Sequence, residues 1–295
     1  MDLMAQLAKT KKDAHIFAVS PAPKRHAVLS NIALLLNERR EEIKKINKID
    51  IINAENMDLS SAMIDRLRLT DKEIDSMIKA VNEISMQKEV IGEVISGYTR
   101  PNGLKIRKVR VPLGVAGIIY ESRPNVTIDS AALCIKSGNG AVLRGGKEAI
   151  NSNKILAEII TDSLEKAGFS KDIIYFIQDT DRNIIKYMAQ AKGLIDVIIP
   201  RGGEGHINFV VDNACIPVIM HDKGVCHVFI DESAEYQQAL SIAFNAKVQR
   251  PSACNSMETL LIHKNISDKM LPEIAGLQST YFNVSGQPLK STSTS

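Results

Sequence analysis

The sequence predicts an α/β fold with a helical N-terminal region, a doubly wound parallel sheet and the beginning of a further α/β domain. Three observations predict this class. Apolar residues recur at helical spacing early in the chain, an alternating segment surrounds an Asn-Gly pair, and short apolar runs then alternate with helical patterns. Strands that alternate with helices pair in parallel through right-handed crossovers.

Residues 1–92 are predicted to form helices. Segments such as "SSAMIDRLRLTDKEIDSMIKAVNEI" place apolar residues three and four positions apart, with charged residues between them. This spacing is typical of a helix that buries one face and exposes the other.

Residues 93–112 are predicted to form a β-hairpin. The segment "EVISGYTRPNGLKIRKVRVP" has two extended halves around "RPNG", and its second half alternates apolar and basic residues. Asn-Gly favours a type I′ turn, in which both central residues have positive φ. One face of the hairpin is therefore expected to meet water or a partner.

Residues 113–245 are predicted to form the doubly wound domain. The runs "VAGIIY", "AVLR", "IIYFI", "IDVIIP", "PVIM" and "VCHVFI" read as strands, with helical patterns between or after them. Near-continuous apolar strands fit a sheet covered on both faces. Residues 246–276 are predicted to begin a second α/β domain, and residues 277–295 resemble an atypical tail because they lack a clear period.

Composition excludes several classes of protein. The chain has 295 residues, a net charge of +3, no Trp and 4% aromatic residues. So weak a positive charge, with so few aromatic side chains, argues against nucleic-acid binding. Neither a membrane-spanning tract nor a secretory signal is visible, so a cytoplasmic protein is expected. The cysteine and histidine spacings match no zinc site, so no metal is expected.

Two glycine-rich turns follow predicted strands. "RGGKEA" follows "AVL", and "PRGGEG" follows "DVII". Ligands of doubly wound sheets bind at the carboxyl ends of strands, where glycine lets backbone N–H groups approach a phosphate. Because no G-x-G-x-x-G is present, each segment is either an ordinary turn or part of a nucleotide site. The candidate residues are Arg144, Gly145, Gly146, Lys147, Arg201, Gly202 and Gly203.

Cys254 differs in its surroundings from the other three cysteines. Cys134, Cys215 and Cys226 lie in or beside apolar segments and are expected in the core. Cys254 lies in the polar stretch "KVQRPSACNS", between a predicted helix and a predicted strand and close to two basic residues. An ordinary thiol is only about 3% thiolate at pH 7, and nearby positive charge lowers its pKa. Residue context leaves two interpretations, a buried thiol or a nucleophile.

Several long segments together resemble a known enzyme family. They are "VPLGVAGIIYESRPNVTIDSAALCIKSGNGAVLRGGKEA", "GLIDVIIPRGGEG", "PVIMHDKGVCHVFIDESA" and "NAKVQRPSACNSMETLLIH". In this order they resemble the glutamate-5-semialdehyde dehydrogenases, or γ-glutamyl phosphate reductases, a branch of the aldehyde dehydrogenase superfamily. The resemblance implies an aldehyde dehydrogenase-like fold, in which residues 1–92 and 113–245 bind NADP, residues 93–112 form an oligomerisation arm and residues 246–276 start the catalytic domain.

The resemblance also implies a reaction. NADPH would reduce L-glutamyl 5-phosphate to L-glutamate 5-semialdehyde and phosphate, the second step of proline biosynthesis from glutamate. Cys254 matches the family's nucleophile, which forms a thioester with the acyl group. Asn125 matches the superfamily's oxyanion asparagine, and such a donor is typically worth about 10²–10³ in rate.

Further residues are carried over by the same resemblance. Arg144 and Lys147 would bind the 2′-phosphate and so favour NADPH over NADH. Arg123 and Arg250 are expected to bind the substrate. A homo-oligomer of the full-length protein and an association with glutamate 5-kinase are the macromolecular partners that the family implies.

The end of the chain leaves a second interpretation open. The sequence departs from the family pattern near Gly276, so it is expected to be truncated at its C-terminus relative to the family, with a partly built catalytic domain. The alternative function is therefore that of an inactive fragment that binds nucleotide or associates with full-length subunits. A related acylating aldehyde dehydrogenase with another substrate is a third possibility.

Overall fold

The computed structural model describes residues 3–220, 224–249 and 255–279. Contacts group the chain into two compact units, residues 1–220 and residues 221–295. Each unit has its own hydrophobic core. None of the helices in the described ranges is long and apolar enough to cross a membrane.

The first unit begins with helices, as the spacing of apolar residues predicts. The helices are α1 (Leu3–Phe17), α2 (Ala22–Glu38), α3 (Arg40–Asn56), α4 (Ser61–Leu67) and α5 (Asp71–Met86). Helix α5 starts with a capping box, in which the Glu73 side chain accepts a hydrogen bond from the backbone N–H of Thr70. Its buried residues are three or four positions apart, so one face of the helix packs on the core.

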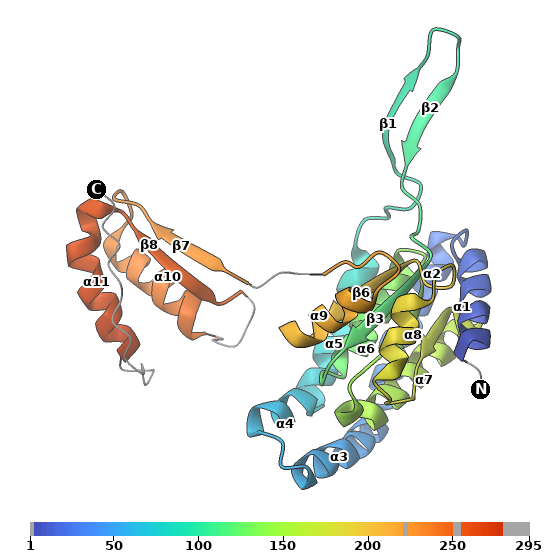
Figure 1. Cartoon of the computed structure of the whole chain (residues 1–295), viewed down its shortest axis with the longest axis horizontal. Coiled ribbons are helices and arrows are strands. Elements are labelled where there is room, and N and C mark those ends of the chain that lie inside the picture. The colour runs from blue at the N-terminus through green and yellow to red at the C-terminus, as the bar shows by residue number, and fades with distance from the viewer. Residues whose placement is uncertain (1–2, 221–223, 250–254, 280–295) are drawn as a thin grey trace. The chain divides into compact units, whose positions relative to one another are not determined.

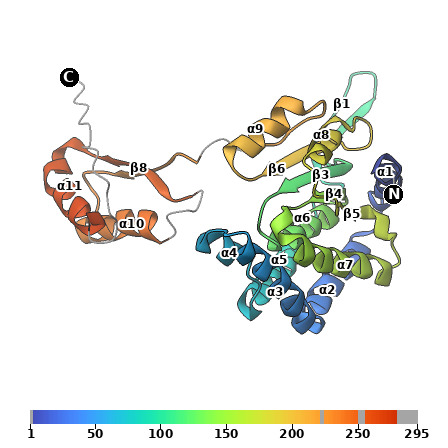
Figure 2. The same cartoon turned by 60° about the horizontal axis from the view of Figure 1, so that its bottom comes forward.

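A four-stranded parallel sheet forms the centre of this unit (Figures 1 and 2). Its strand order is β5-β4-β3-β6, so the chain moves outward from β3 to β5 and then returns to the other side of β3. This reversal makes the carboxyl end of β3 the topological switch point, where ligands of such sheets bind. The strands are β3 (Val115–Tyr120), β4 (Gly140–Arg144), β5 (Ile174–Phe176) and β6 (Val197–Arg201).

Helices cover both faces of the sheet. They are α6 (Asn125–Lys136), α7 (Ile150–Lys166), α8 (Asn183–Gln190) and α9 (Glu204–Asn213), with short 3₁₀ turns at Lys147–Ala149 and Lys171–Ile173. One core lies between the sheet and helices α2, α5, α6 and α7, and a second lies between the sheet and helices α1, α8 and α9. The strands are buried on both faces, as near-continuous apolar runs predict.

The predicted hairpin is present, but its turn differs from the prediction. Strands β1 (Val94–Thr99) and β2 (Lys105–Val109) pair antiparallel and project from the first unit (Figure 1). The N–H of Gly103 donates to the carbonyl oxygen of Arg100 at 2.9 Å, and Gly103 has φ +84° whereas Asn102 does not have positive φ. The type I′ prediction is therefore wrong. Pro101 holds φ near −65° inside the turn, which favours a type I turn followed by a left-handed glycine.

Two smaller predictions about residues 215–220 are also wrong. The run "PVIM" contributes only an isolated bridge between Val218 and Ile198, not a full strand. Cys215 is exposed, because the inward position after α9 is taken by Ile216. Cys134, by contrast, is buried in the core as predicted, and burial raises the pKa of its thiol to about 12.

The second unit has its own small parallel sheet. Strand β7 (Cys226–Ile230) pairs with β8 (Met257–Ile262), and helices α10 (Tyr236–Val248) and α11 (Lys264–Ser279) pack on this pair. The predicted domain boundary between residues 245 and 246 is therefore wrong. The contacts place it between residues 220 and 221, because β7 and α10 share a core with β8 and α11.

Candidate functional site

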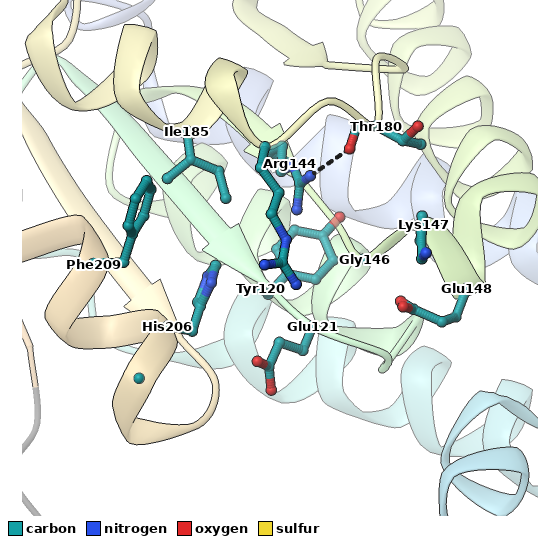
Figure 3. A pocket seen from close by; sticks show the side chains of 12 residues that line it. Tyr120, Glu121, Arg144, Gly146, Lys147, Glu148, Thr180, Ile185, His206 and Phe209 are labelled. Atoms are coloured by element: carbon teal, nitrogen blue, oxygen red, sulfur yellow. Dashed lines mark hydrogen bonds between the residues drawn. The ribbon is translucent and has the colours of Figure 1, made fainter. Parts of the chain in front are cut away.

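A cavity of about 520 Å³ opens at the carboxyl edge of the sheet in the first unit (Figure 3). Its walls come from the ends of β3 and β4, the loop before α8, and helices α8 and α9. Figure 3 shows Arg144 above Tyr120, with Lys147 and Glu148 on one side and His206 and Phe209 on the other. The lining residues are Tyr120, Glu121, Arg144, Gly146, Lys147, Glu148, Thr180, Arg182, Ile185, Gly205, His206 and Phe209.

Arg144 is the most deeply placed cation of the cavity. It is the last residue of β4, and only 7% of the residue is exposed. Its Nη2 donates to the backbone carbonyl of Thr180 at 3.0 Å, while its buried Nε has no hydrogen-bond partner among the described residues. Burial lowers the pKa of Arg144; the negative charge of Glu148 opposes this, and the positive charge of Arg182 adds to it. The guanidinium still remains charged, because its ordinary pKa is far above neutrality.

The start of α9 supplies a second polar feature. Gly203, just before this helix, donates its backbone N–H to the carboxylate of Glu121 at 3.2 Å. A Cβ added at Gly202 would lie 2.6 Å from Cδ of Glu121, so the close approach of this side chain depends on glycine. A negative group at a helix N-terminus is favoured by the unpaired N–H groups and the helix dipole.

His206 faces the same cavity from α9. Burial lowers the pKa of its imidazole. The negative charge of Glu121 opposes this change, and the positive charges of Arg144 and Arg182 add to it. The neutral imidazole is therefore favoured at neutral pH.

Asn125 lies at the start of α6, outside the cavity lining. Its Nδ2 donates to Oδ2 of Asp129, one helical turn later, at 3.0 Å. Burial raises the pKa of Asp129, and the hydrogen bond from Asn125 opposes this rise. Because a carboxylate only accepts hydrogen bonds, the contact fixes which end of the Asn125 amide faces Asp129.

The structure brings together some of the predicted site residues. Arg144, Gly146 and Lys147 line the cavity, whereas Gly145, Arg201, Gly202 and Gly203 lie close by in sequence without lining it. Arg123 is exposed in the loop before α6. Cys254 and Arg250 lie outside the described residues.

Sequence analysis missed most of the other lining residues. Glu121 directly follows β3, and Thr180 and Arg182 follow β5. Polar residues immediately after parallel strands are the signal that finds such positions. The segment "QDTDR" after "IIYFI" has that character, although it lacks a glycine pair.

Comparisons with known proteins bear on this arrangement. The model of the aldehyde dehydrogenase family matches residues 1–293. The γ-glutamyl phosphate reductase of Sulfurihydrogenibium sp. is 46% identical over 286 residues, which are 96% of this chain and 63% of that protein. The chain thus spans less than two thirds of the length of this relative.

Solved structures of γ-glutamyl phosphate reductases also match this chain. The crystal structure of γ-glutamyl phosphate reductase from Thermotoga maritima matches with a TM-score of 0.90 at 40% identity, over 95% of this chain and 68% of that one. The Saccharomyces cerevisiae γ-glutamyl phosphate reductase matches with a TM-score of 0.70 at 28% identity, over 95% of this chain and 70% of that one. These matches confirm the predicted fold class.

Proposed function

The chain belongs to the aldehyde dehydrogenase family, and from this premise we propose that it is the NADPH-dependent reductase of L-glutamyl 5-phosphate. The product would be L-glutamate 5-semialdehyde, the intermediate of proline biosynthesis from glutamate. One observation carries the proposal: relatives that are 45–46% identical to this chain, and a solved structure that matches it with a TM-score of 0.90, are named γ-glutamyl phosphate reductases.

The cavity has properties that suit a nicotinamide nucleotide. Its volume of about 520 Å³ lies within the range of small-molecule sites, about 300–1,000 Å³. Arg144 has a buried Nε without a partner among the described residues, and Lys147 adds a second positive charge. At Gly146 an added Cβ would lie 2.5 Å from Oε2 of Glu148. The lack of a side chain at Gly146 therefore leaves room for the Glu148 carboxylate beside the turn. The turn residues Gly145, Gly202, Gly203 and Arg201 are proposed to complete the cofactor site.

NADPH is proposed as the cofactor because the cavity presents cations to a phosphate-rich ligand. Bound there, it would supply the hydride that reduces the acyl group. The net positive lining favours the extra 2′-phosphate that distinguishes NADPH from NADH, since guanidinium and ammonium groups pair strongly with phosphate.

Cys254 is proposed as the nucleophile. Its thiolate would attack the acyl carbon of the substrate, form a thioester and release phosphate, so that the phosphate leaves with the bonding electron pair. Reduction of the thioester would give the aldehyde and return the thiolate. Asn125 is proposed to hold the oxyanion through its amide N–H, which is worth about 10²–10³ in rate for comparable donors. Arg123 and Arg250 are proposed to bind the carboxylate or phosphate of the substrate.

The reaction is tested in the direction in which the aldehyde is oxidised. Phosphate-dependent reduction of NADP⁺ by glutamate 5-semialdehyde should fall about 10³-fold or more in Cys254→Ala, because the covalent route is lost. Cys215→Ala is the matched control, since that cysteine is exposed. Full activity in Cys254→Ala would refute the assigned nucleophile.

A second candidate function is nucleotide binding without turnover. It is favoured by the cavity, whose lining residues all belong to the first unit. NADPH binding by the 295-residue chain without any semialdehyde oxidation would support it, and normal turnover would exclude it. An acylating aldehyde dehydrogenase for another substrate would instead show faster turnover with other acyl phosphates or with coenzyme A thioesters.

Partners and compartment are part of the same proposal. The hairpin of β1 and β2 has an exposed first strand and is proposed as the oligomerisation arm. Association with glutamate 5-kinase would carry the acyl phosphate between the two enzymes. As a biosynthetic reductase, the protein is proposed to act in the cytoplasm.

A further inference from the structure

Arg182 is a cation of the cavity that sequence analysis did not select. It lies in the loop between β5 and α8, it is exposed, and it lines the cavity. Among the described residues it forms no ion pair. An exposed guanidinium that faces a cavity without a carboxylate partner has its full hydrogen-bonding capacity available to a ligand.

The loop that carries Arg182 is held in place by its neighbours. Nη2 of Arg144 donates to the carbonyl of Thr180 at 3.0 Å. The N–H of Asp181 donates to Oδ1 of Asp179 at 2.9 Å, and the N–H of Asn183 donates to Oδ1 of Asp181 at 3.0 Å. The two aspartates thus accept bonds from backbone N–H groups and do not line the cavity. Arg182 is therefore presented from an ordered turn, which reduces the entropy lost when it binds a ligand.

The charges inside the cavity are unbalanced around Arg182. Three cations line it, and the two lining carboxylates are Glu121 and Glu148. Glu121 already accepts the N–H of Gly203. Arg182 lines the same cavity as Arg144 and His206, and its positive charge lowers the pKa of both groups. Two neighbouring guanidinium groups repel each other, and an anion between them relieves that repulsion.

The two arginines differ in what they can offer a ligand. Arg144 is 7% exposed, and one of its terminal nitrogens is occupied by Thr180. Arg182 keeps both terminal nitrogens free of any hydrogen bond within the described residues, so it can present the planar fork that matches two phosphate oxygens.

We infer that Arg182 is the residue that binds a phosphate group of the nucleotide directly, with Arg144 fixing the loop behind it. The inference rests on the proposed function, because it assumes that the cavity takes a nicotinamide nucleotide. The shared chemistry is a phosphate ester, which has two sources in NADPH: the 2′-phosphate and the central diphosphate. NADH contains only the second.

The test is a binding titration of the full 295-residue chain with NADPH and with NADH, by isothermal calorimetry. Arg182→Leu should weaken NADPH binding about tenfold to a hundredfold, the range for a charge-assisted bidentate contact. Arg182→Lys should give a smaller loss, because it keeps the charge and loses the fork. Lys186→Leu is the matched control, since it removes one exposed charge from α8 without touching the cavity.

The two nucleotides separate the two sources of phosphate. A loss for NADPH alone assigns Arg182 to the 2′-phosphate, and an equal loss for both nucleotides assigns it to the diphosphate. Unchanged binding of both in Arg182→Leu, or the same loss in Lys186→Leu, overturns the inference. If the unsubstituted chain binds neither nucleotide, it is the proposed function that fails. A melting temperature equal to that of the unsubstituted chain shows that each variant is folded.

Discussion

At the residue scale, Asp129 holds the side chain of Asn125, the proposed oxyanion donor, through a hydrogen bond. Burying the Asp129 carboxylate has a cost in free energy. Burial raises the pKa of this carboxyl above its ordinary value, and the bond from Asn125 opposes the rise. A raised folded-state pKa means that the folded protein retains a proton that the unfolded chain has already lost. The associated stability is fully present below the unfolded pKa, about 3.9, and is lost as the pH rises through the folded pKa.

Asp129→Asn is therefore expected to stabilise the protein at pH 7 relative to the unsubstituted chain. The amide is neutral at every pH, so the cost of burying a charge disappears. The gain should shrink as the pH falls through the raised folded-state pKa, because Asp129 itself then becomes neutral in the folded protein. Urea unfolding of both proteins between pH 4 and 7 measures the difference.

Asp212→Asn is the control for this prediction, because Asp212 is an exposed aspartate of α9. Its effect on the free energy of unfolding at pH 7 should stay within about 0.5 kcal/mol, as for other exposed positions. A loss of stability at pH 7 in Asp129→Asn would mean that the hydrogen bond between Asn125 and the carboxylate outweighs the cost of burial.

The candidate site was only partly predictable from single residues. Arg144, Gly146 and Lys147 were found because a basic glycine turn after an apolar run is a recognisable local pattern. Arg182 lies in a polar segment that lacks a glycine pair, and His206 lies just beyond the turn "PRGGEG", so neither was selected. They reach the cavity only because α8 and α9 pack next to each other on one face of the sheet.

At the scale of elements, helix α7 depends on a carboxylate from another helix. Asp50 of α3 is 1% exposed. Its Oδ2 accepts from the backbone N–H of Ser152 at 2.7 Å and from the Ser152 hydroxyl at 2.6 Å. Its Oδ1 accepts from the backbone N–H of Asn151 at 3.2 Å. Asp50 therefore caps the first turn of α7, where N–H groups lack partners within the helix.

Asp50→Ala should lower the free energy of unfolding by about 2–3 kcal/mol. The substitution leaves the buried N–H groups of Asn151 and Ser152 without an acceptor and removes a negative charge from a helix N-terminus. Urea denaturation monitored by circular dichroism measures the loss.

Glu55→Ala provides the comparison, because Glu55 is an exposed acidic residue on the same helix α3. Its effect should stay within about 0.5 kcal/mol. Equal stability of Asp50→Ala and Glu55→Ala would show that water replaces the lost cap.

Periodicity predicted the elements better than it predicted their connections. The spacing of apolar residues predicts the helices and the central strands, because this spacing is visible within a short stretch of sequence. The hairpin turn differs from the prediction because its central residues are Pro101 and Asn102, and Pro101 excludes positive φ at its own position. The run at Val218 remained a bridge because strand length depends on the neighbouring strand as well as on composition.

At the scale of the whole molecule, the domain boundary could not be located from periodicity. Strand β7 follows the first sheet in sequence and resembles its strands in composition, so it was assigned to the same domain. Its partner β8 lies beyond α10, and that pairing is a long-range contact which local patterns do not encode. The two units consequently have separate hydrophobic cores, drawn from residues before 220 and after 225 respectively.

Separate cores predict that residues 1–220 fold without the rest of the chain. Both faces of the four-stranded sheet are covered by helices from within this segment, so the segment contains every residue of its own two cores. The isolated segment should unfold cooperatively in urea, with a free energy within about 0.5 kcal/mol of the same unit in the full chain. It should also retain NADPH binding, since the whole cavity lining lies within it.

A segment of residues 1–196 is the matched control for that experiment. It removes β6, which pairs along its length with β3. It also removes α9, whose Val210 is fully buried in the first unit's core between the sheet and helices α1, α8 and α9. Loss of an edge strand and of its covering helix exposes apolar surface that the remaining chain cannot cover. The shorter segment should therefore lack a cooperative transition. If residues 1–220 behave in the same way, the first unit depends on contacts from residues 221–295, and the two-unit division is wrong.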